Sequence, residues 1–564
     1  MCPRTLVKLG LLACLLPSLA CGDDAPAQPD TAGSETSSGG ESSTSVPPVG
    51  TDTTTGDDLP PPGSDSSTTM MDDVGSETGE PAQPEVELLV LASDAGGHLK
   101  YFYYRRSADD TEGPVMIVPP DDSSWDAAVQ VPGRRVVYRV DTDDATQLVL
   151  GSIEDEDHMQ VLSVPPVPTD GSSWLMPIPD AEAGIFASPA DDTIYRVDFP
   201  DGIPSAPVVV GTEAINSYPL PPEIDALGRW TPLSRVTGAA TDVVLARVDV
   251  PDPDAPIPVT AVEAMQTAWS LGFNRAGTSF FVAVADDIAA REIRHLDVGP
   301  DDPGMSTLIH PPLAPNESLR QIMIAEAGHG ILYVVEDTDT EMSTMWWVDV
   351  VAGVPTDPVA VIEGISYVGY EWWSADGRWL TLELDTDDGA ARHLLDVTGG
   401  AQPAVYQLDT AQYDTVQFSP DSTWMFVTRS TPEGGTLSRV PLGATGPGRE
   451  EIVATSTPEL MVGYVDDVSS DGQRLLIDGG SGETPLQLLI DLSQPLPATP
   501  VVVNRTLAPG DWAQFGEFSP DDQYVLYIER NDIFGPERLM IVPIDDPGNA
   551  EIVKENIIGY DLVE

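Results

Sequence analysis

The chain has 564 residues, of which 92 are acidic and 26 basic, and its formal net charge is −66. A surface this anionic repels nucleic acid, so we exclude DNA and RNA as partners. The three cysteines, Cys2, Cys14 and Cys21, all lie in the first 21 residues. No disulfide or thiolate metal site is therefore expected in the rest of the chain.

The first 21 residues have the pattern of an export signal. Arg4 and Lys8 are followed by an apolar run at 9–16 and then by small residues up to Cys21. This order predicts a signal peptide over 1–21. The Ala-Cys end resembles a bacterial lipoprotein signal, which implies a diacylated, palmitate-bearing Cys21 as the mature first residue. Ser18 stands where such signals usually carry Leu, and ordinary secretion is the alternative.

Residues 22–84 have the composition of a disordered linker. They are rich in Ser, Thr, Gly, Pro and Asp and contain no Lys or Arg. Too few apolar groups are present to offset the entropy of an ordered chain. We expect the lipid on Cys21 to anchor the protein in a membrane and this segment to hold the body, 85–564, away from that membrane. We expect the protein at the outer membrane or cell surface rather than at the inner membrane.

The body contains a repeat in which an apolar residue precedes a turn and a second strand follows. The apolar positions are 49, 51, 49, 45, 50 and 50 residues apart, at Ile224, Phe273, Ile324, Trp373, Phe418, Val468 and Phe518. Turn residues of the Ser-x-Asp-Gly type follow the later copies, and alternating apolar residues after them predict half-buried strands. A period near 50 residues with room for four strands and no helix predicts an all-β propeller.

The best copies, 418–427 and 518–528, resemble the TolB-type, WD40-like propeller repeat. The resemblance is good over about 370–530 and degenerate over 85–370, where the Ser-x-Asp is lost. It implies a propeller of four-stranded blades, with about 8–10 repeat units, in one ring or in two tandem propellers. It implies no particular activity, because this architecture serves binding proteins and enzymes alike.

The two ends of the body supply the remaining strand-like segments, at 86–92 and 557–563. A propeller usually closes by pairing its chain ends. We therefore expect one of these two segments to complete a sheet built mainly by the other end of the body.

Acidic hairpin tips are the strongest recurring polar feature of the body. Paired carboxylates on a tight loop can bind Ca²⁺, although none of these tips matches the full EF-hand pattern. Asp also favours turns through bonds to its own backbone, and this is the preferred reading. The weak calcium candidates are Asp141, Asp143, Asp337, Asp339, Asp385 and Asp387.

No catalytic motif is present in the sequence. It lacks G-x-S-x-G, H-E-x-x-H and the glycine-rich nucleotide loops. We therefore expect a non-enzymatic, lipid-anchored envelope protein that binds a protein or glycan at one propeller face, without a cofactor. A carboxylate-dependent polysaccharide hydrolase or lyase and a structural envelope component are the alternatives.

Overall fold

The computed structural model describes residues 85–562 except 117–127, 153–159, 162–174, 213–223, 260–265, 409–414 and several shorter loops. The chain divides into two units, 1–83 and 84–564, and everything described here belongs to the second. The predicted signal peptide, its Cys21 and all of the predicted linker lie outside the described residues. The described part consists of 40 strands without a helix, so it has no helix able to cross a membrane.

The first three sheets are antiparallel and four-stranded. The first has the strand order β3 (Thr111–Met116), β2 (Leu99–Ser107), β1 (Glu85–Ser93) and β40 (Ile557–Leu562). The second has the order β4 (Ala128–Val131), β5 (Arg135–Asp141), β6 (Thr146–Ser152) and β7 (Gln160–Val161). The third has the order β11 (Val208–Thr212), β10 (Thr193–Asp198), β9 (Ala183–Ser188) and β8 (Leu175–Pro177).

Two wider sheets occupy the middle of the unit. The seven-stranded sheet contains β12 (Trp230–Thr237), β13 (Ala240–Arg247), β14 (Ile257–Pro258), β15 (Gln266–Phe273), β16 (Ser279–Asp286), β17 (Ala289–Asp297) and β18 (Thr307–Leu308). The eight-stranded sheet contains β19 (Glu317–Ile324), β20 (Gly330–Asp337), β21 (Met342–Val351), β22 (Val354–Pro355), β23 (Val359–Trp373), β24 (Trp379–Thr386), β25 (Gly389–Asp396) and β26 (Ala404–Leu408).

Three sheets complete the chain. The first contains β27 (Thr415–Phe418), β28 (Trp424–Thr431), β29 (Gly434–Gly443), β30 (Gly446–Pro447) and β31 (Glu451–Thr455). The second contains β32 (Met461–Val468), β33 (Arg474–Ser481), β34 (Thr484–Asp491) and β35 (Val501–Val502). The third contains β36 (Trp512–Phe518), β37 (Tyr524–Arg530), β38 (Glu537–Pro543) and β39 (Glu551–Glu555).

Each wide sheet joins two groups of strands. In the seven-stranded sheet the join is a single parallel pair, Thr241 with Thr267. In the eight-stranded sheet it is β23, a continuous strand of 15 residues. The first part of β23 pairs with β21, and its last part pairs with β24.

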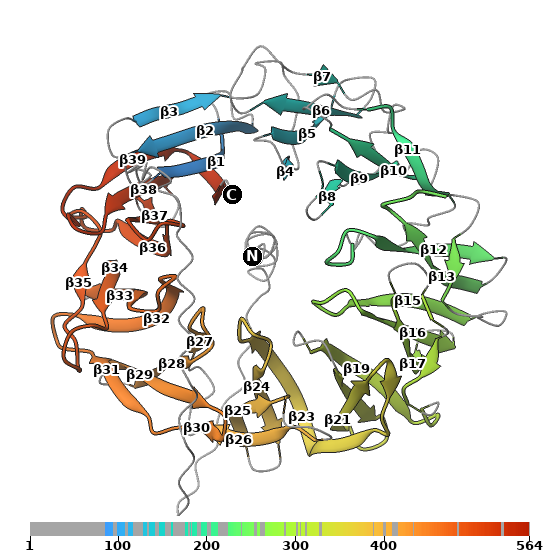
Figure 1. Ribbon diagram of the computed structural model, residues 1–564. Coiled ribbons are helices and arrows are strands. Elements are labelled where there is room, and N and C mark those ends of the chain that lie inside the picture. The colour runs from blue at the N-terminus through green and yellow to red at the C-terminus, as the bar shows by residue number, and fades with distance from the viewer. Residues whose placement is uncertain are drawn as a thin grey trace, which may run out of the picture. The chain divides into compact units, whose positions relative to one another are not determined.

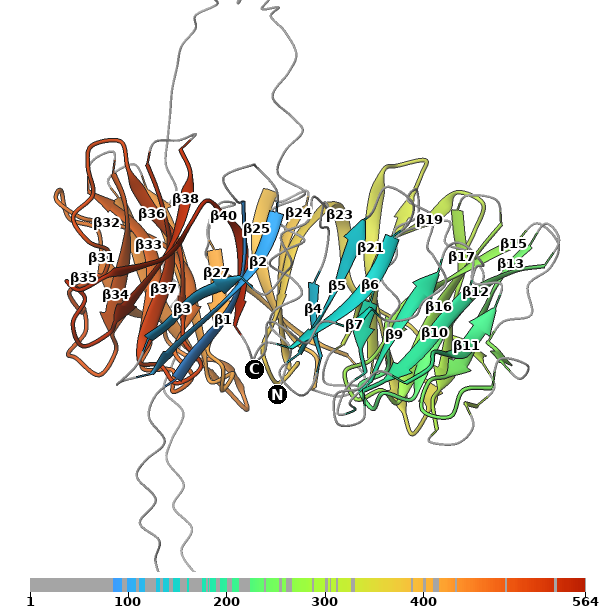
Figure 2. The ribbon, with the colours of Figure 1, turned by 90° about the horizontal axis from the view of Figure 1, so that it is seen from above.

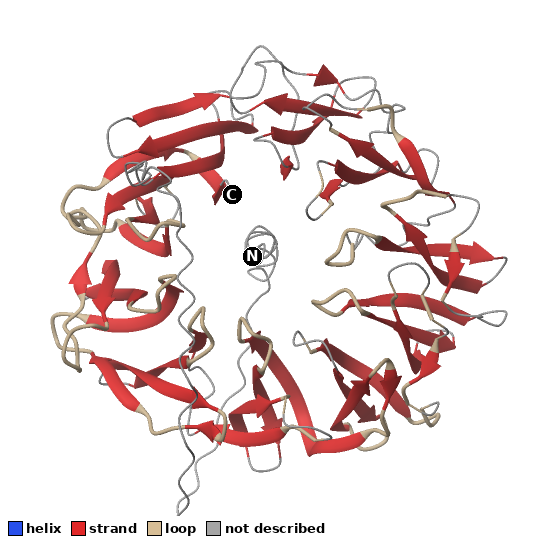
Figure 3. Cartoon of the chain, viewed as in Figure 1, coloured by secondary structure: helices blue, strands red, loops and turns tan. Residues whose placement is uncertain are grey.

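The apolar cores lie between neighbouring sheets, or between the two strand groups of a wide sheet. One contains Phe426 and Leu437 from one sheet with Leu475 and Ile477 from the next, all fully buried. Figure 1 shows the sheets of this unit following one another in sequence order about a common centre. Figure 2 shows them within one layer, and Figure 3 shows the predominance of strands.

The strands that follow the repeated turn are buried on both faces, not on one. β20 and β37 are buried along almost their whole length. Our expectation of half-buried strands was therefore wrong at these positions. The reason is that each of these strands lies inside its sheet, and that sheet is covered by a neighbour on either side.

The two ends of the body meet in one sheet. β40 pairs antiparallel with β1, for example Leu88 with Leu562 and Leu91 with Gly559. Residues Val86, Val90 and Ile557 then share an apolar core with Leu526 and Ile541 of the last sheet. The predicted pairing of the two ends is confirmed.

Candidate functional site

The repeated turn has one geometry in six copies. Its first residue accepts a backbone N–H from the residue five positions later, as at Asp225–Trp230 (2.8 Å) and Ser519–Tyr524 (3.0 Å). The fourth residue is left-handed, for example Gly228 (φ 67°). The first residues of the six copies are Asp225, Asn274, Ser374, Ser419, Ser469 and Ser519.

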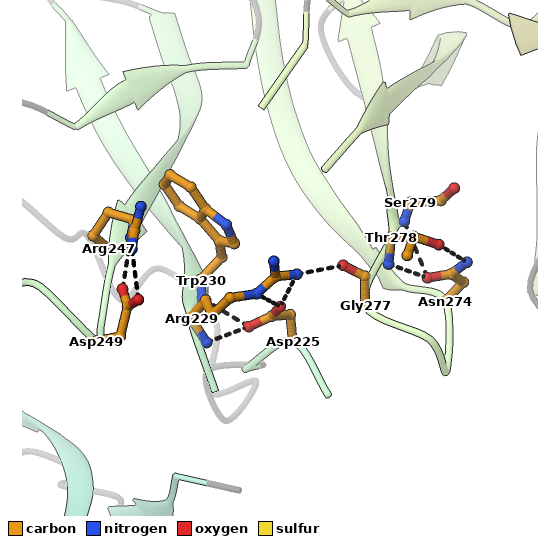
Figure 4. Close-up of polar contacts among 9 residues, drawn as sticks. All are labelled: Asp225, Arg229, Trp230, Arg247, Asp249, Asn274, Gly277, Thr278 and Ser279. Carbon is orange, nitrogen blue, oxygen red and sulfur yellow. Dashed lines mark hydrogen bonds and ion pairs between the residues drawn. The ribbon is translucent and has the colours of Figure 1, made fainter. Parts of the chain in front are cut away.

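The degenerate copies keep this turn with a single side chain. In the later copies Ser419 Oγ donates to Asp421 (2.6 Å), and Asp421 accepts the Thr423 N–H (3.0 Å). In the earlier copies a single oxygen accepts both backbone N–H groups, those four and five residues further along the chain. Asp225 Oδ1 accepts the N–H groups of Arg229 and Trp230 (Figure 4). Asn274 Oδ1 does the same for Thr278 and Ser279.

The turns also connect neighbouring groups of strands, both within the seven-stranded sheet and between sheets. Arg229 donates to the carbonyl of Gly277 (3.3 Å), as drawn in Figure 4. The Ser470 N–H donates to Asp522 (3.0 Å), and the Asp376 N–H donates to Ser422 Oγ (3.0 Å). Their polar groups are used inside the scaffold, so the motif explains architecture rather than ligand binding.

The calcium candidates are spread over separate strands and turns. Asp141 ends β5, Asp337 ends β20 and Asp385 lies in β24, whereas Asp143 and Asp387 fall outside the described residues. The Asp337 carboxylate accepts the Asp339 N–H (2.9 Å), which is a turn contact. Within the described ranges, no group of three or more metal-ligating side chains occurs.

A different group of side chains converges where the last two sheets meet the first. We call it the inner-strand site because Figure 1 shows β32 and β36 on the side of their sheets facing the common centre. Tyr464 and Phe515, on these two strands, are 47% and 52% exposed. The site comprises Tyr464, Asp466, Asp467, Asp478, Gln487, Phe515, Glu517 and Tyr560.

Asp466 and Asp478 form a hydrogen-bonded carboxyl pair. Burial, together with the charge of Asp466, raises the pKa of Asp478 to about 8. Two adjacent carboxylates cannot both ionise cheaply in a partly buried place, so the pair holds a proton at pH 7. Asp478 Oδ1 accepts no bond from the described residues.

The same carboxyl groups tie β32 to β36. Asp466 Oδ2 accepts the Gly516 N–H (3.2 Å), and Asp467 Oδ2 accepts the Phe518 N–H (2.9 Å). Gln487 Nε2 also donates a hydrogen bond to Asp466 Oδ2 (3.0 Å). From the first sheet, the Tyr560 hydroxyl donates to Glu517 (3.3 Å), and burial followed by the nearby carboxylates raises the pKa of Tyr560.

Bulges beside glycines turn the aromatic residues outward. The register of β32 shifts between Val462 and Val465, and that of β36 between Gln514 and Glu517. A Cβ on Gly463 would lie 2.5 Å from the Asp478 carbonyl, and one on Gly516 2.5 Å from Gln487 Cδ. Glycine is required at 463, where the contact is with backbone, and at 516 a larger residue would displace the Gln487 amide; the neighbour of each glycine occupies the bulge.

A related layout occurs on β23. Tyr367 is 53% exposed, and the register shifts on both sides of it. Glu371 accepts a bond from Gln321 of β19 (3.0 Å), and burial raises the pKa of Glu371. The combination of exposed aromatic, bulge and carboxyl is therefore not confined to one sheet.

None of the inner-strand residues was singled out from sequence. The one available signal is Asp466-Asp467, two carboxylates in a strand just before a repeated turn. A strand that packs toward a core rarely carries such a pair.

Comparisons with protein families and with curated proteins found no match. Among solved structures, the chain is similar to a eukaryotic initiation factor at 12% identity, covering 85% of this chain and 98% of that one, with a TM-score of 0.43. It is also similar to prolyl oligopeptidase B from Galerina marginata at 12% identity, covering 66% and 55%, with a TM-score of 0.34. Scores this low carry no argument about this protein.

Proposed function

We propose that the second unit is one β-propeller of ten blades. Six single sheets give six blades, and each wide sheet gives two, joined at Thr241–Thr267 and through β23. The repeated turn at intervals near 50 residues supports equivalent units, and the β1–β40 pair supports closure in one ring. This choice replaces the broader range of 8–10 units and the two-ring alternative.

We propose that this propeller is a non-enzymatic binding protein for a protein or glycan. The observation that carries the proposal is the exposed aromatic pair, Tyr464 and Phe515, beside the Asp466–Asp478 pair on bulged inner strands. Bulges of this kind often re-aim side chains next to functional sites. Exposed aromatic rings beside carboxyl groups suit recognition of a partner surface.

The N-terminal segment supports attachment to a membrane. Cys21 would carry the lipid, and the polar stretch 22–84 would separate the anchor from the propeller. About 63 residues of flexible chain span on the order of 45 Å. Such a tether suits a protein that meets its partner at the cell envelope.

The test is a pull-down from envelope extract with the full-length protein, with and without calcium. A stoichiometric protein or glycan that is lost with the double variant Tyr464→Ala/Phe515→Ala supports the proposal. Ile452→Ala is the matched control, because Ile452 is 52% exposed on β31, which supplies no residue of the inner-strand site. Recovery of no partner in either condition would count against it.

A further inference from the structure

The repeated turns lie at one end of the strands, and we call this end of the second unit the turn face. Hydrogen bonds link neighbouring turns, as from Arg229 to the Gly277 carbonyl (Figure 4) and from the Ser470 N–H to Asp522. Because the strands of each sheet are antiparallel, the strand after the one that begins at a turn runs back and ends at the same face. β13 and β21 are two strands that end there.

The four most exposed large apolar side chains among the described residues all lie at the turn face. They are Leu227 (55% exposed), Val250 (64%), Val351 (57%) and Val354 (64%). We call these four side chains the apolar patch. Exposed apolar groups gathered on one face of a protein mark a surface that contacts another molecule.

The first half of the patch belongs to the group of strands β12–β14. Leu227 lies within the turn that begins at Asp225. Val250 follows the end of β13, where the Val248 N–H donates to the Arg229 carbonyl (2.7 Å). The turn and the end of β13 therefore lie side by side.

The second half is the tip of the hairpin formed by β21 and β22, where Val351 pairs with Val354. A Cβ on Gly353 in this tip would lie 2.7 Å from Asp297 Oδ2. Asp297 ends β17 and pairs with Ser279, the last residue of another repeated turn. The hairpin tip is thus placed on the turn face by its neighbour.

The chain outside the described residues joins the body at the same face. β1 begins at Glu85, and Arg106, the partner of the next residue, lies over the Tyr524 ring (5.1 Å). Tyr524 is the last residue of the final repeated turn. The stretch 22–84, with the proposed lipid at its far end, is therefore attached to the turn face.

The two ends of the strands differ in charge. At the opposite end of β21, the hairpin tip carries the exposed carboxylates of Asp339 and Glu341. Beside Val250 on the turn face, the Asp249 carboxylate is ion-paired with Arg247 (2.5 Å). A membrane surface with negative charge repels the acidic tips more strongly than the turn face, so the body approaches a bilayer with the turn face first.

The tether allows weak contacts to be sufficient. The 63 residues of 22–84 form a flexible chain, which holds the body near the bilayer at an effective concentration of roughly millimolar. A patch with only millimolar affinity for lipid is then occupied for much of the time. Four aliphatic side chains are enough for contact of this strength.

We infer that the apolar patch docks the turn face of the body on a lipid bilayer. The inference rests on the proposed attachment at Cys21 and goes beyond it, because a flexible tether alone leaves the orientation of the body free. The patch enters the boundary between headgroups and acyl chains, and the acidic tips face away from the bilayer. A second copy of this chain is a poorer occupant, since both copies carry a formal charge of −66.

The test uses the full-length protein, lipidated in a bacterial host and reconstituted into phosphatidylcholine vesicles. No cysteine follows Cys21, so Ala352→Cys or Thr340→Cys supplies one thiol for a fluorescent label. Ala352 lies in the patch hairpin and Thr340 in the acidic tip, and both are exposed. We expect lipids spin-labelled near the headgroup to quench the label at 352 at least about fivefold more than the label at 340.

The two halves of the patch can be separated by variants. Leu227→Ser/Val250→Ser should lower the quenching at 352 by about half or more, because docking needs both halves. Ile452→Ser is the matched control: Ile452 is 52% exposed on β31, away from the turn residues in the chain, and the quenching should not change. All these side chains are exposed, so the packed core is retained, and equal melting temperatures check this.

Equal quenching at 340 and 352, stronger quenching at 340, or no effect of Leu227→Ser/Val250→Ser would overturn the inference. Capture of an envelope protein that this double variant abolishes, without quenching by lipid, would also overturn it and assign the patch to a protein partner. Any of these results in protein that carries palmitate leaves the proposed attachment standing. Protein without palmitate that does not bind vesicles would refute the attachment and the docking together.

Discussion

The proton shared by Asp466 and Asp478 makes the stability of the protein fall as pH rises from about 4 to 8. The pKa of Asp478 is raised from 3.8 to about 8 by burial and by Asp466. The folded state therefore binds this proton more tightly than the unfolded state does. The resulting stabilisation is complete below about pH 4 and is lost as pH rises through 8.

Asp478→Asn should therefore flatten the pH dependence of the melting temperature between pH 5 and 9. At pH 9 we expect the variant to melt about 2 °C or more above the unmodified protein, because two adjacent negative charges are avoided. Differential scanning calorimetry measures this. Asp357→Asn removes an exposed carboxylate elsewhere and should not change the profile; identical profiles for both variants would contradict the assignment.

His295 creates the opposite dependence in acid. It is 1% exposed, contacts Ser279 Oγ at 3.1 Å, and burial lowers its pKa from 6.5 to about 4. The unfolded state takes up the proton first as pH falls, so stability is lost between pH 6.5 and 4. At pH 4.5, two units below 6.5, the loss is at most about 3 kcal/mol.

His295→Gln should remove this loss. Urea unfolding at pH 7 and pH 4.5 measures it as the change in free energy of unfolding between the two conditions. His310→Gln is the control for loss of an imidazole. If the unmodified protein and His295→Gln lose equal stability on acidification, another group dominates the acid response.

At the scale of the structural element, the repeated turn is the unit that organises each sheet. Ser519→Ala removes the acceptor of the Tyr524 N–H, in a turn where both residues are buried. We expect a loss of about 1–3 kcal/mol, as for other buried groups left without a partner. Asp225→Ala should cost more, because Asp225 also accepts from the Arg229 backbone and side chain.

Equilibrium urea unfolding measures both losses. Ser493→Ala is the matched control, since Ser493 bonds Asp491 on the exposed surface and should cost less than about 1 kcal/mol. A loss at Ser519 no larger than at Ser493 would show that the repeated turn is not a stabilising unit.

The turns and the strands after them could be predicted from the sequence, because both depend on residues close together in the chain. The copies at Asp225 and Asn274 looked degenerate because the pattern required Ser and Asp, whereas the fold requires only an oxygen that reaches two N–H groups. The inner-strand site could not be predicted. Asp466 lies beside Asp478 because the register of β32 shifts at a bulge, which the sequence does not reveal. Glu517 contacts Tyr560 only because the two chain ends pair.

At the scale of the whole molecule, β40 is the strand whose loss should matter most. A chain lacking 557–564 leaves the edge of β1 unpaired from Leu88 to Ala92 and removes the buried Ile557. We expect the melting temperature to fall by roughly 5 °C or more. Ile558→Ala, at a position 40% exposed, is the control; a deletion that melts like this control would contradict the closure.

Lipid attachment at Cys21 remains a prediction for the N-terminal unit. In a bacterial host, Cys21→Ser should leave the protein unprocessed or release it from the membrane fraction. Labelling with palmitate followed by fractionation measures this. Cys14→Ser is the matched control and should keep its label, whereas label that survives Cys21→Ser would refute the assignment.

The pairing of β40 with β1 also has a consequence for the order in which the protein is made. β1 is the first described strand to leave the ribosome, and its partner β40 is the last. Until then the Leu88–Ala92 edge can pair with other chains, which is how exposed edges begin aggregation. Chaperones would therefore have to protect this edge for almost the whole time of synthesis, and a stalled chain would be an early target for proteases.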